Sequence, residues 1–195
     1  MRLQRFCVLI VIFALDCAVA GTGVYPQYVG RNVCANCHSD QVAQWSGSHH
    51  DLAMQPASEE TVRGDFDNTK LTHFEQISLF FREDGRFMVR TEGADGKNFD
   101  YPIKYTFGVE PLQQYLIEFP GGHLQALSLA WDTRPKENGG QRWFHLYPDE
   151  QITHDDELHW TRPSQNWNSM CAECHSTHLE KKYNPLDRTF ATTWS

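Results

Sequence analysis

Four cysteines of this 195-residue chain stand in two short motifs, and each motif ends in a histidine. The first motif is Cys34-Ala35-Asn36-Cys37-His38 and the second is Cys171-Ala172-Glu173-Cys174-His175. On a helical turn, residues at i, i+3 and i+4 share one face, so the two thiols and the imidazole of each motif point the same way. This C-x-x-C-H spacing is the signature for covalent attachment of c-type haem, with the histidine on the iron.

The two motifs predict two covalently attached haem c groups. The attachment residues are Cys34, Cys37, Cys171 and Cys174, and the proximal iron ligands are His38 and His175. A zinc ribbon is the first alternative, but its two knuckles stand about 15 to 20 residues apart. Here more than half of the chain separates Cys37 from Cys171. A dithiol redox pair, the second alternative, explains one C-x-x-C but neither the duplication nor the histidines.

The first twenty residues resemble an export signal. Two arginines precede the apolar run Phe6–Leu15, and the small residues Ala18-Val19-Ala20 follow it. An apolar helix that crosses a bilayer needs about 20 residues, so a cleaved signal peptide over residues 1–20 is favoured over a permanent anchor. The mature protein is therefore expected in the bacterial periplasm or outside the cell, where c-type haem is attached, and its only contact with the membrane is through the export signal.

The charge balance restricts the partners. The chain has 25 Asp and Glu against 17 Lys and Arg, a formal net charge of -8, so nucleic acid is not expected to bind. Redox partner proteins or neighbouring haem domains are the expected partners. Five acidic residues surround His154 and form either a solvated loop or a docking patch for a basic partner: Asp149, Glu150, Asp155, Asp156 and Glu157.

The segment after the first motif carries four residues in the register W-x-x-S-x-H-x-x-A: Trp45, Ser48, His50 and Ala53. This register resembles that of multihaem cytochromes of the c-552/4 type. The resemblance implies that His50 is a distal axial ligand, to a haem other than that of its own motif, and His49 is the alternative. We also expect a helix that continues from the first motif to Met54.

A second resemblance covers residues 28–195. It is carried by residues 105–116, 158–161 and 165–168 together with the second motif, and these are similar to the N-terminal part of bacterial multihaem cytochromes with tetratricopeptide repeats. The resemblance implies His159 as another candidate distal ligand. Such chains usually carry further C-x-x-C-H motifs and helical repeats. We therefore expect either a shortened member or, as the favoured interpretation, a fragment of a longer chain.

The centre of the chain, residues 70–148, has a β-rich pattern. Short runs with period-two alternation or many aromatic residues predict strands: His73–Phe81, Arg86–Thr91, Lys104–Phe107, Tyr115–Phe119, Leu124–Trp131 and Trp143–Tyr147. Dipeptides such as Asp84-Gly85 favour tight turns between them. The predicted fold class is α+β with few long helices. Two haem-bearing helical or loop segments, residues 28–56 and 158–182, flank an antiparallel meander of five to seven strands in one domain, residues 21–195.

Several histidines are available to close both haem irons, which favours electron transfer by Fe(III)/Fe(II) cycling over catalysis. No catalytic residue is predicted. Two alternatives stay open. One is a multihaem oxidoreductase with an open iron that acts on a small nitrogen or sulfur compound, and the other is a haem-based sensor or scaffold.

Overall fold

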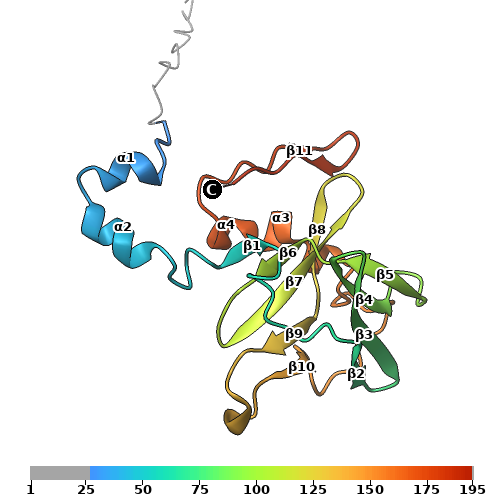
Figure 1. Cartoon of the computed structure of the whole chain (residues 1–195). Helices are drawn as coiled ribbons and strands as arrows, with labels where there is room; N and C mark the ends of the chain where they lie inside the picture. Colours follow the sequence, from blue (N-terminus) through green and yellow to red (C-terminus); the bar gives the residue numbers. More distant parts are fainter. Residues whose placement is uncertain (1–26, 195) are drawn as a thin grey trace, which may run out of the picture.

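The computed structural model describes residues 27–194, so the predicted signal peptide, residues 1–20, lies outside the described residues. Two antiparallel sheets form most of the molecule (Figure 1). The four-stranded sheet is a meander of β2 (Thr69–His73), β3 (Gln76–Glu83), β4 (Arg86–Glu92) and β5 (Asn98–Pro102). The six-stranded sheet has the order β1 (Met54–Pro56), β6 (Tyr105–Phe107), β7 (Leu112–Phe119), β9 (Leu129–Asp132) and β10 (Arg142–His145), with β8 (His123–Ala126) paired to β7.

The helices are short. Two precede the sheets, namely α1 (Arg31–Ala35) and α2 (Ser39–Trp45), and two follow them, namely α3 (Trp167–Met170) and α4 (Ala172–His175). The 3-10 turns η1 (Lys136–Asn138) and η2 (Pro163–Gln165) and a final hairpin of β11 (Tyr183–Asn184) and β12 (Thr189–Phe190) complete the described elements. No helix among residues 27–194 has the length and apolar character needed to cross a membrane.

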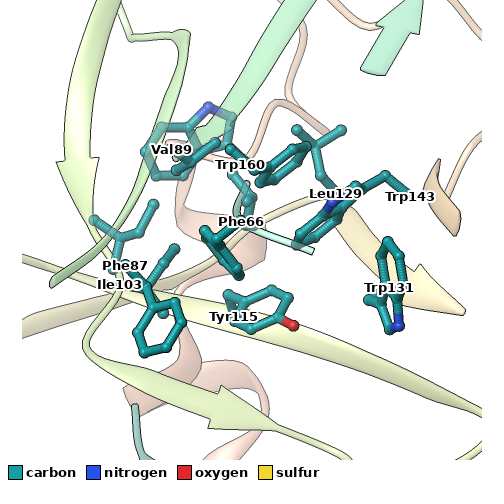
Figure 2. Packing of buried hydrophobic residues seen from close by; sticks show 12 residues of the cluster. Phe66, Phe87, Val89, Ile103, Tyr115, Leu129, Trp131, Trp143 and Trp160 are labelled. Atoms are coloured by element: carbon teal, nitrogen blue, oxygen red, sulfur yellow. The ribbon is translucent and has the colours of Figure 1, made fainter. Parts of the chain in front are cut away.

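The main core lies between the two sheets and is rich in aromatic rings (Figure 2). Phe66 makes edge contacts with four other rings: Phe80, Phe87, Tyr115 and Trp143. Phe80 stacks on Trp143 with ring centroids 3.5 Å apart. A side chain at Gly64 would come within 2.6 Å of the Tyr115 hydroxyl, so glycine is required for this close packing. Burial of these large rings supplies most of the apolar stabilisation.

A second core lies on the opposite face of the six-stranded sheet. Along β7, Tyr115 and Ile117 belong to the main core, whereas Leu116 between them belongs to the second one. This alternation follows from the two-residue period of a strand. Trp167 and Ala172 pack against Leu116, so α3 and α4 cover the sheet face that is turned away from the four-stranded sheet.

Three details differ from the sequence-based expectations. The predicted run Leu124–Trp131 is divided into β8 and β9, which pair with the same strand, β7. Strands β1 and β5, and β2 apart from His73, lie outside the predicted runs; the β5 sequence NFDYP contains residues that are depleted in strands. The predicted helix to Met54 is wrong: α2 ends at Trp45, Ser46 is extended, and Gly47 has a positive φ of 75°.

Candidate functional site

Each C-x-x-C-H motif closes the same helical turn. In the first motif the His38 amide donates to the Cys34 carbonyl at 2.9 Å, and in the second the His175 amide donates to the Cys171 carbonyl at 3.2 Å. The four cysteines in the described part of the chain are free thiols. The turn holds the two thiols and the imidazole on one side of the backbone, as covalent haem attachment requires.

The surroundings of the two motifs differ. Helices α1 and α2 contribute no buried residue, and Cys34, Cys37 and His38 are exposed. The second motif follows Trp167, which is completely buried, and its Cys171 is half-buried. Burial raises the pKa of the Cys171 thiol. The second motif is thus anchored to the folded sheet through Cys171 and Ala172, although its Cys174 and His175 are exposed like the residues of the first motif.

Asn168 fixes the backbone that leads into the second motif. Its side-chain oxygen accepts from the Leu124 amide at 2.7 Å, and its amide nitrogen donates to the Gly122 carbonyl at 3.1 Å and to the Thr192 hydroxyl at 2.9 Å. This side chain is completely buried. A buried amide with several partners gives the segment one defined position.

A cavity of about 840 Å³ lies beside the second motif; we call it the haem cavity. Cys174 and His175 line it from α4, and His50 lines it from the loop after α2. The volume is in the range of cofactor sites, roughly 300 to 1,000 Å³. The volume, the Cys174 thiol and the imidazoles of His50 and His175 therefore fit a haem at the second motif, whereas Cys171 packs against the second core and does not line the cavity. Cys34, Cys37 and His38 do not line this cavity.

The loop that carries His50 is held by its neighbour Asp51. The Asp51 carboxylate accepts from the Gly47 amide at 2.8 Å and from the Arg31 guanidinium at 3.1 Å. That guanidinium also lies 4.8 Å from the centre of the Trp45 ring. These contacts connect α1 to the His50 loop and position the imidazole on the cavity wall. Sequence reasoning missed Arg31 and Asp51, because no local pattern marks an ion pair across 20 residues.

The structure does not bring His159 to either motif. Its ring is buried, and Nδ1 lies 2.8 Å from the Thr161 hydroxyl. It lines a separate cavity of about 40 Å³ together with His73 and His145, a volume far too small for a porphyrin. Burial lowers the pKa of His159. His49 is exposed, with Nε2 3.6 Å from a carboxylate oxygen of Glu110.

The small interior cavity is polar, which the sequence did not predict. The rings of His73 and His145 stack with centroids 3.9 Å apart, and burial together with His73 lowers the pKa of His145 to about 4. Glu92 is 4 % exposed; one of its carboxylate oxygens lies 2.9 Å from Nδ1 of His154 and the other has no hydrogen-bond partner in the structure. A cavity of this size has room for water, which would satisfy that oxygen.

The zinc alternative requires the two C-x-x-C pairs to meet at one point. Among residues 27–194, no three side chains of His, Cys, Asp or Glu are placed so that they could hold a metal ion. The two pairs of thiols therefore do not form the shared tetrahedral site of a zinc ribbon.

Comparison with families of known proteins gives a match to part of the chain. Residues 33–78 match the family described as cytochrome c554 and c-prime. The matched stretch contains the first C-x-x-C-H motif and His50, but not the second motif. It relates the chain to c-type cytochromes and implies covalently bound haem c. The comparisons with curated proteins and with solved structures returned no match.

Proposed function

We propose that this chain is an exported c-type cytochrome that binds two haem groups covalently and transfers electrons between a donor and an acceptor protein. The haem cavity carries the proposal, because it has the two partners of a six-coordinate iron, His175 and His50, on its walls. The family match supports the cofactor and its electron-transfer role.

The residues of the chain have separate tasks in this proposal. Cys34 and Cys37, and likewise Cys171 and Cys174, form thioethers to a porphyrin, while His38 and His175 ligate the irons. When bound, haem supplies one-electron Fe(III)/Fe(II) chemistry. His50 closes the sixth position at the second site and so excludes added ligands. The cavity wall combines aromatic rings such as Trp45 and Trp194 with polar side chains such as Gln55, and this mixture would tune the potential of the bound group.

The number of haems is tested with two double variants. Cys34→Ala with Cys37→Ala, and Cys171→Ala with Cys174→Ala, should each lower the covalent haem count of the matured protein from two to one. Mass spectrometry and the pyridine haemochrome spectrum measure that count. A wild-type count of one, or a double variant that keeps both haems, contradicts the assignment of that motif.

The distal ligand is tested with two adjacent histidines. His50→Ala should convert one haem from low spin to high spin and allow it to bind carbon monoxide. His49→Ala is the matched control, because the His49 ring is exposed. Among the ion pairs between described residues, it takes part in one, with Glu110. Optical and electron paramagnetic resonance spectra report the change. An unchanged spectrum for His50→Ala would assign the sixth position to another group, such as Met54 on the same cavity.

A second candidate function has one observation in its favour. The first motif does not line the cavity that contains His50. An open iron at the first site would suit an oxidoreductase for a small nitrogen or sulfur compound. Cyanide or carbon monoxide binding to wild-type protein separates the two functions. Two low-spin haems that refuse both ligands support electron transfer alone.

Export and partners complete the proposal. The signal over residues 1–20 should be removed near Ala20, which N-terminal sequencing of the periplasmic protein detects. Electrons would then pass to redox partner proteins or to neighbouring haem domains. Cross-linking of the matured protein, in its reduced and in its oxidised form, identifies the proteins that receive or donate the electrons.

A further inference from the structure

A second large groove, of about 630 Å³, lies beside α3 and the final hairpin; we call it the side groove. It shares no lining residue with the haem cavity. The side chains that matter for its chemistry come from β8, α3 and the hairpin region: His123, Met170, Lys181, Tyr183, Arg188 and Phe190. Its volume suits a ligand of two or three fused rings.

One wall of the side groove is aromatic. The Phe190 ring meets His123 edge to face at 5.0 Å and lies 4.8 Å from the Tyr183 ring. Met170 of α3 also lines the groove. This apolar residue is 61 % exposed, and Tyr183 is also exposed. Exposed apolar residues that gather at a groove mark an interaction site, and methionine packs well against aromatic rings.

The aromatic wall is fixed to the sheet. The Phe190 amide donates to the Gly121 carbonyl at 2.8 Å, and Nε2 of His123 donates to the Arg188 carbonyl at 2.7 Å. A side chain at Gly122 would collide with the Phe190 carbonyl oxygen, so the hairpin lies directly on this turn. A ligand that enters the groove therefore meets walls that are already in place, which lowers the entropic cost of binding.

The groove carries positive charge although the chain is acidic. Lys181 and Arg188 both line it, whereas the whole chain has a formal net charge of -8. Lys181 pairs with Glu173 at 3.1 Å, but Arg188 takes part in none of the ion pairs between described residues. A free guanidinium at the edge of an aromatic groove favours a planar ligand with a sulfonate, carboxylate or phosphate group.

We propose that the side groove binds a planar aromatic anion that accepts electrons, of the chemical class of sulfonated quinones and flavin phosphates. Met170 in the groove wall directly precedes Cys171, so the bound ring would lie next to the second haem. A haem bound at the second motif would supply one electron, its iron going from Fe(II) to Fe(III), and the aromatic ring would accept it; no covalent bond would form or break. Binding stands by itself, whereas the electron transfer rests on the proposed function.

Two flavins that differ in charge test the binding. Flavin mononucleotide and uncharged riboflavin are titrated into the matured protein, and fluorescence quenching measures each affinity. The phosphate should strengthen binding by roughly 1.5- to 5-fold, the range of one partly exposed ion pair. Anthraquinone disulfonate should displace both flavins, which shows that the two classes share the groove. Failure of both flavins to bind at millimolar concentration overturns the proposal.

Matched variants test whether the flavins bind in the side groove. Arg188→Gln should weaken the binding of flavin mononucleotide by the same roughly 1.5- to 5-fold and leave riboflavin binding unchanged, because only the charge is lost. Tyr183→Ser should weaken both flavins. Arg86→Gln is the control, since Arg86 is an exposed arginine on the distant four-stranded sheet. Equal losses in Arg188→Gln and Arg86→Gln would show non-specific attraction and would contradict the groove.

Electron transfer is tested separately from binding. Stopped-flow mixing of the reduced protein with anthraquinone disulfonate should show oxidation whose rate saturates with the quinone, and Arg188→Gln should raise the half-saturating concentration. The double variant Cys171→Ala with Cys174→Ala should still bind flavin mononucleotide but lose the fast phase. Retention of that phase with one haem fewer would refute transfer from the second haem. An unchanged haem count in this variant would instead refute the proposed function.

Discussion

The two C-x-x-C-H motifs are almost identical in sequence but stand in different surroundings. The first lies in what we call the N-terminal arm, residues 27–53, whose helices α1 and α2 have no buried residue. The second follows Trp167 and Asn168, both completely buried on the six-stranded sheet. The pentapeptide therefore sets the local turn and the chemistry, while the tertiary structure decides how firmly each motif is held.

This difference gives the haem cavity two unequal walls. The wall with Cys174 and His175 belongs to the sheet side, and the wall with His50 belongs to the N-terminal arm. The arm wall is held by the ion pair of Arg31 and Asp51 and by Trp45, all of which keep substantial contact with solvent. A bound haem would add contacts between the two walls and so stabilise the arm more than the sheet.

The largest expected effect comes from matched tryptophans on the two sides. Trp167→Ala should lower the free energy of unfolding by about 3 to 5 kcal/mol, the usual cost of removing a buried Trp from a core. Trp45→Ala should lower it by less than about 1 kcal/mol, since that ring is 42 % exposed. Urea unfolding followed by far-ultraviolet circular dichroism measures both. Equal losses would remove the distinction between the motifs.

A fall in pH should lower the stability of the folded protein through histidines on the sheet side. The folded-state pKa of His145 is about 4, below its unfolded value near 6.5, so between these values only the unfolded chain binds the proton. Stability should therefore fall as the pH falls through this window, by on the order of 1 to 2 kcal/mol after allowance for solvent screening. The lowered pKa of His159 acts in the same direction.

The His145→Phe variant checks this assignment. It keeps a flat ring against His73 but cannot take up a proton, so the urea midpoint should change less between neutral and mildly acidic solution than in the wild-type protein. His49→Phe makes the same substitution at an exposed position of the N-terminal arm and is the matched control. A smaller acid dependence in His49→Phe than in His145→Phe would place the acid-sensitive group in the arm and contradict the difference between the two regions.

The local parts of this structure could be predicted from the sequence. Runs of branched and aromatic residues indicated the strands β3 and β7, because these side chains are enriched in strands. The motif turns follow from spacing within five residues. The end of α2 at Trp45 could not be predicted in this way, since Asp51 stabilises the turn through Gly47 and through Arg31, which lies 20 positions away.

The candidate site was predictable only in part. No sequence pattern indicates whether His50 and the second motif meet, because more than 120 positions separate them and only the folded sheet brings them to one cavity. His159 shows the opposite outcome. Its neighbour Trp160 is buried in the main core and donates from its indole nitrogen to the Glu92 carbonyl at 2.7 Å, which draws His159 into the interior.

The smallest expected effect concerns the ion pair that holds the arm wall. Asp51→Asn weakens the contact to Arg31 but keeps an oxygen for the Gly47 amide. Because the pair is partly exposed, the free energy of unfolding should change by less than about 1 kcal/mol. Glu118→Gln, which breaks the exposed pair with Lys104 on the six-stranded sheet, is the matched control and should have a similarly small effect.

The two variants should differ in the haem spectrum rather than in stability. Loss of the Arg31 contact loosens the loop of His50, so Asp51→Asn should show a small carbon monoxide-binding fraction at one haem, and Glu118→Gln should show none. A stability loss for Asp51→Asn as large as that for Trp167→Ala would mean that the arm is as firmly integrated as the sheet side. An identical spectrum in both variants would mean that Asp51 has no part in positioning His50, and that the arm wall is held by its other contacts.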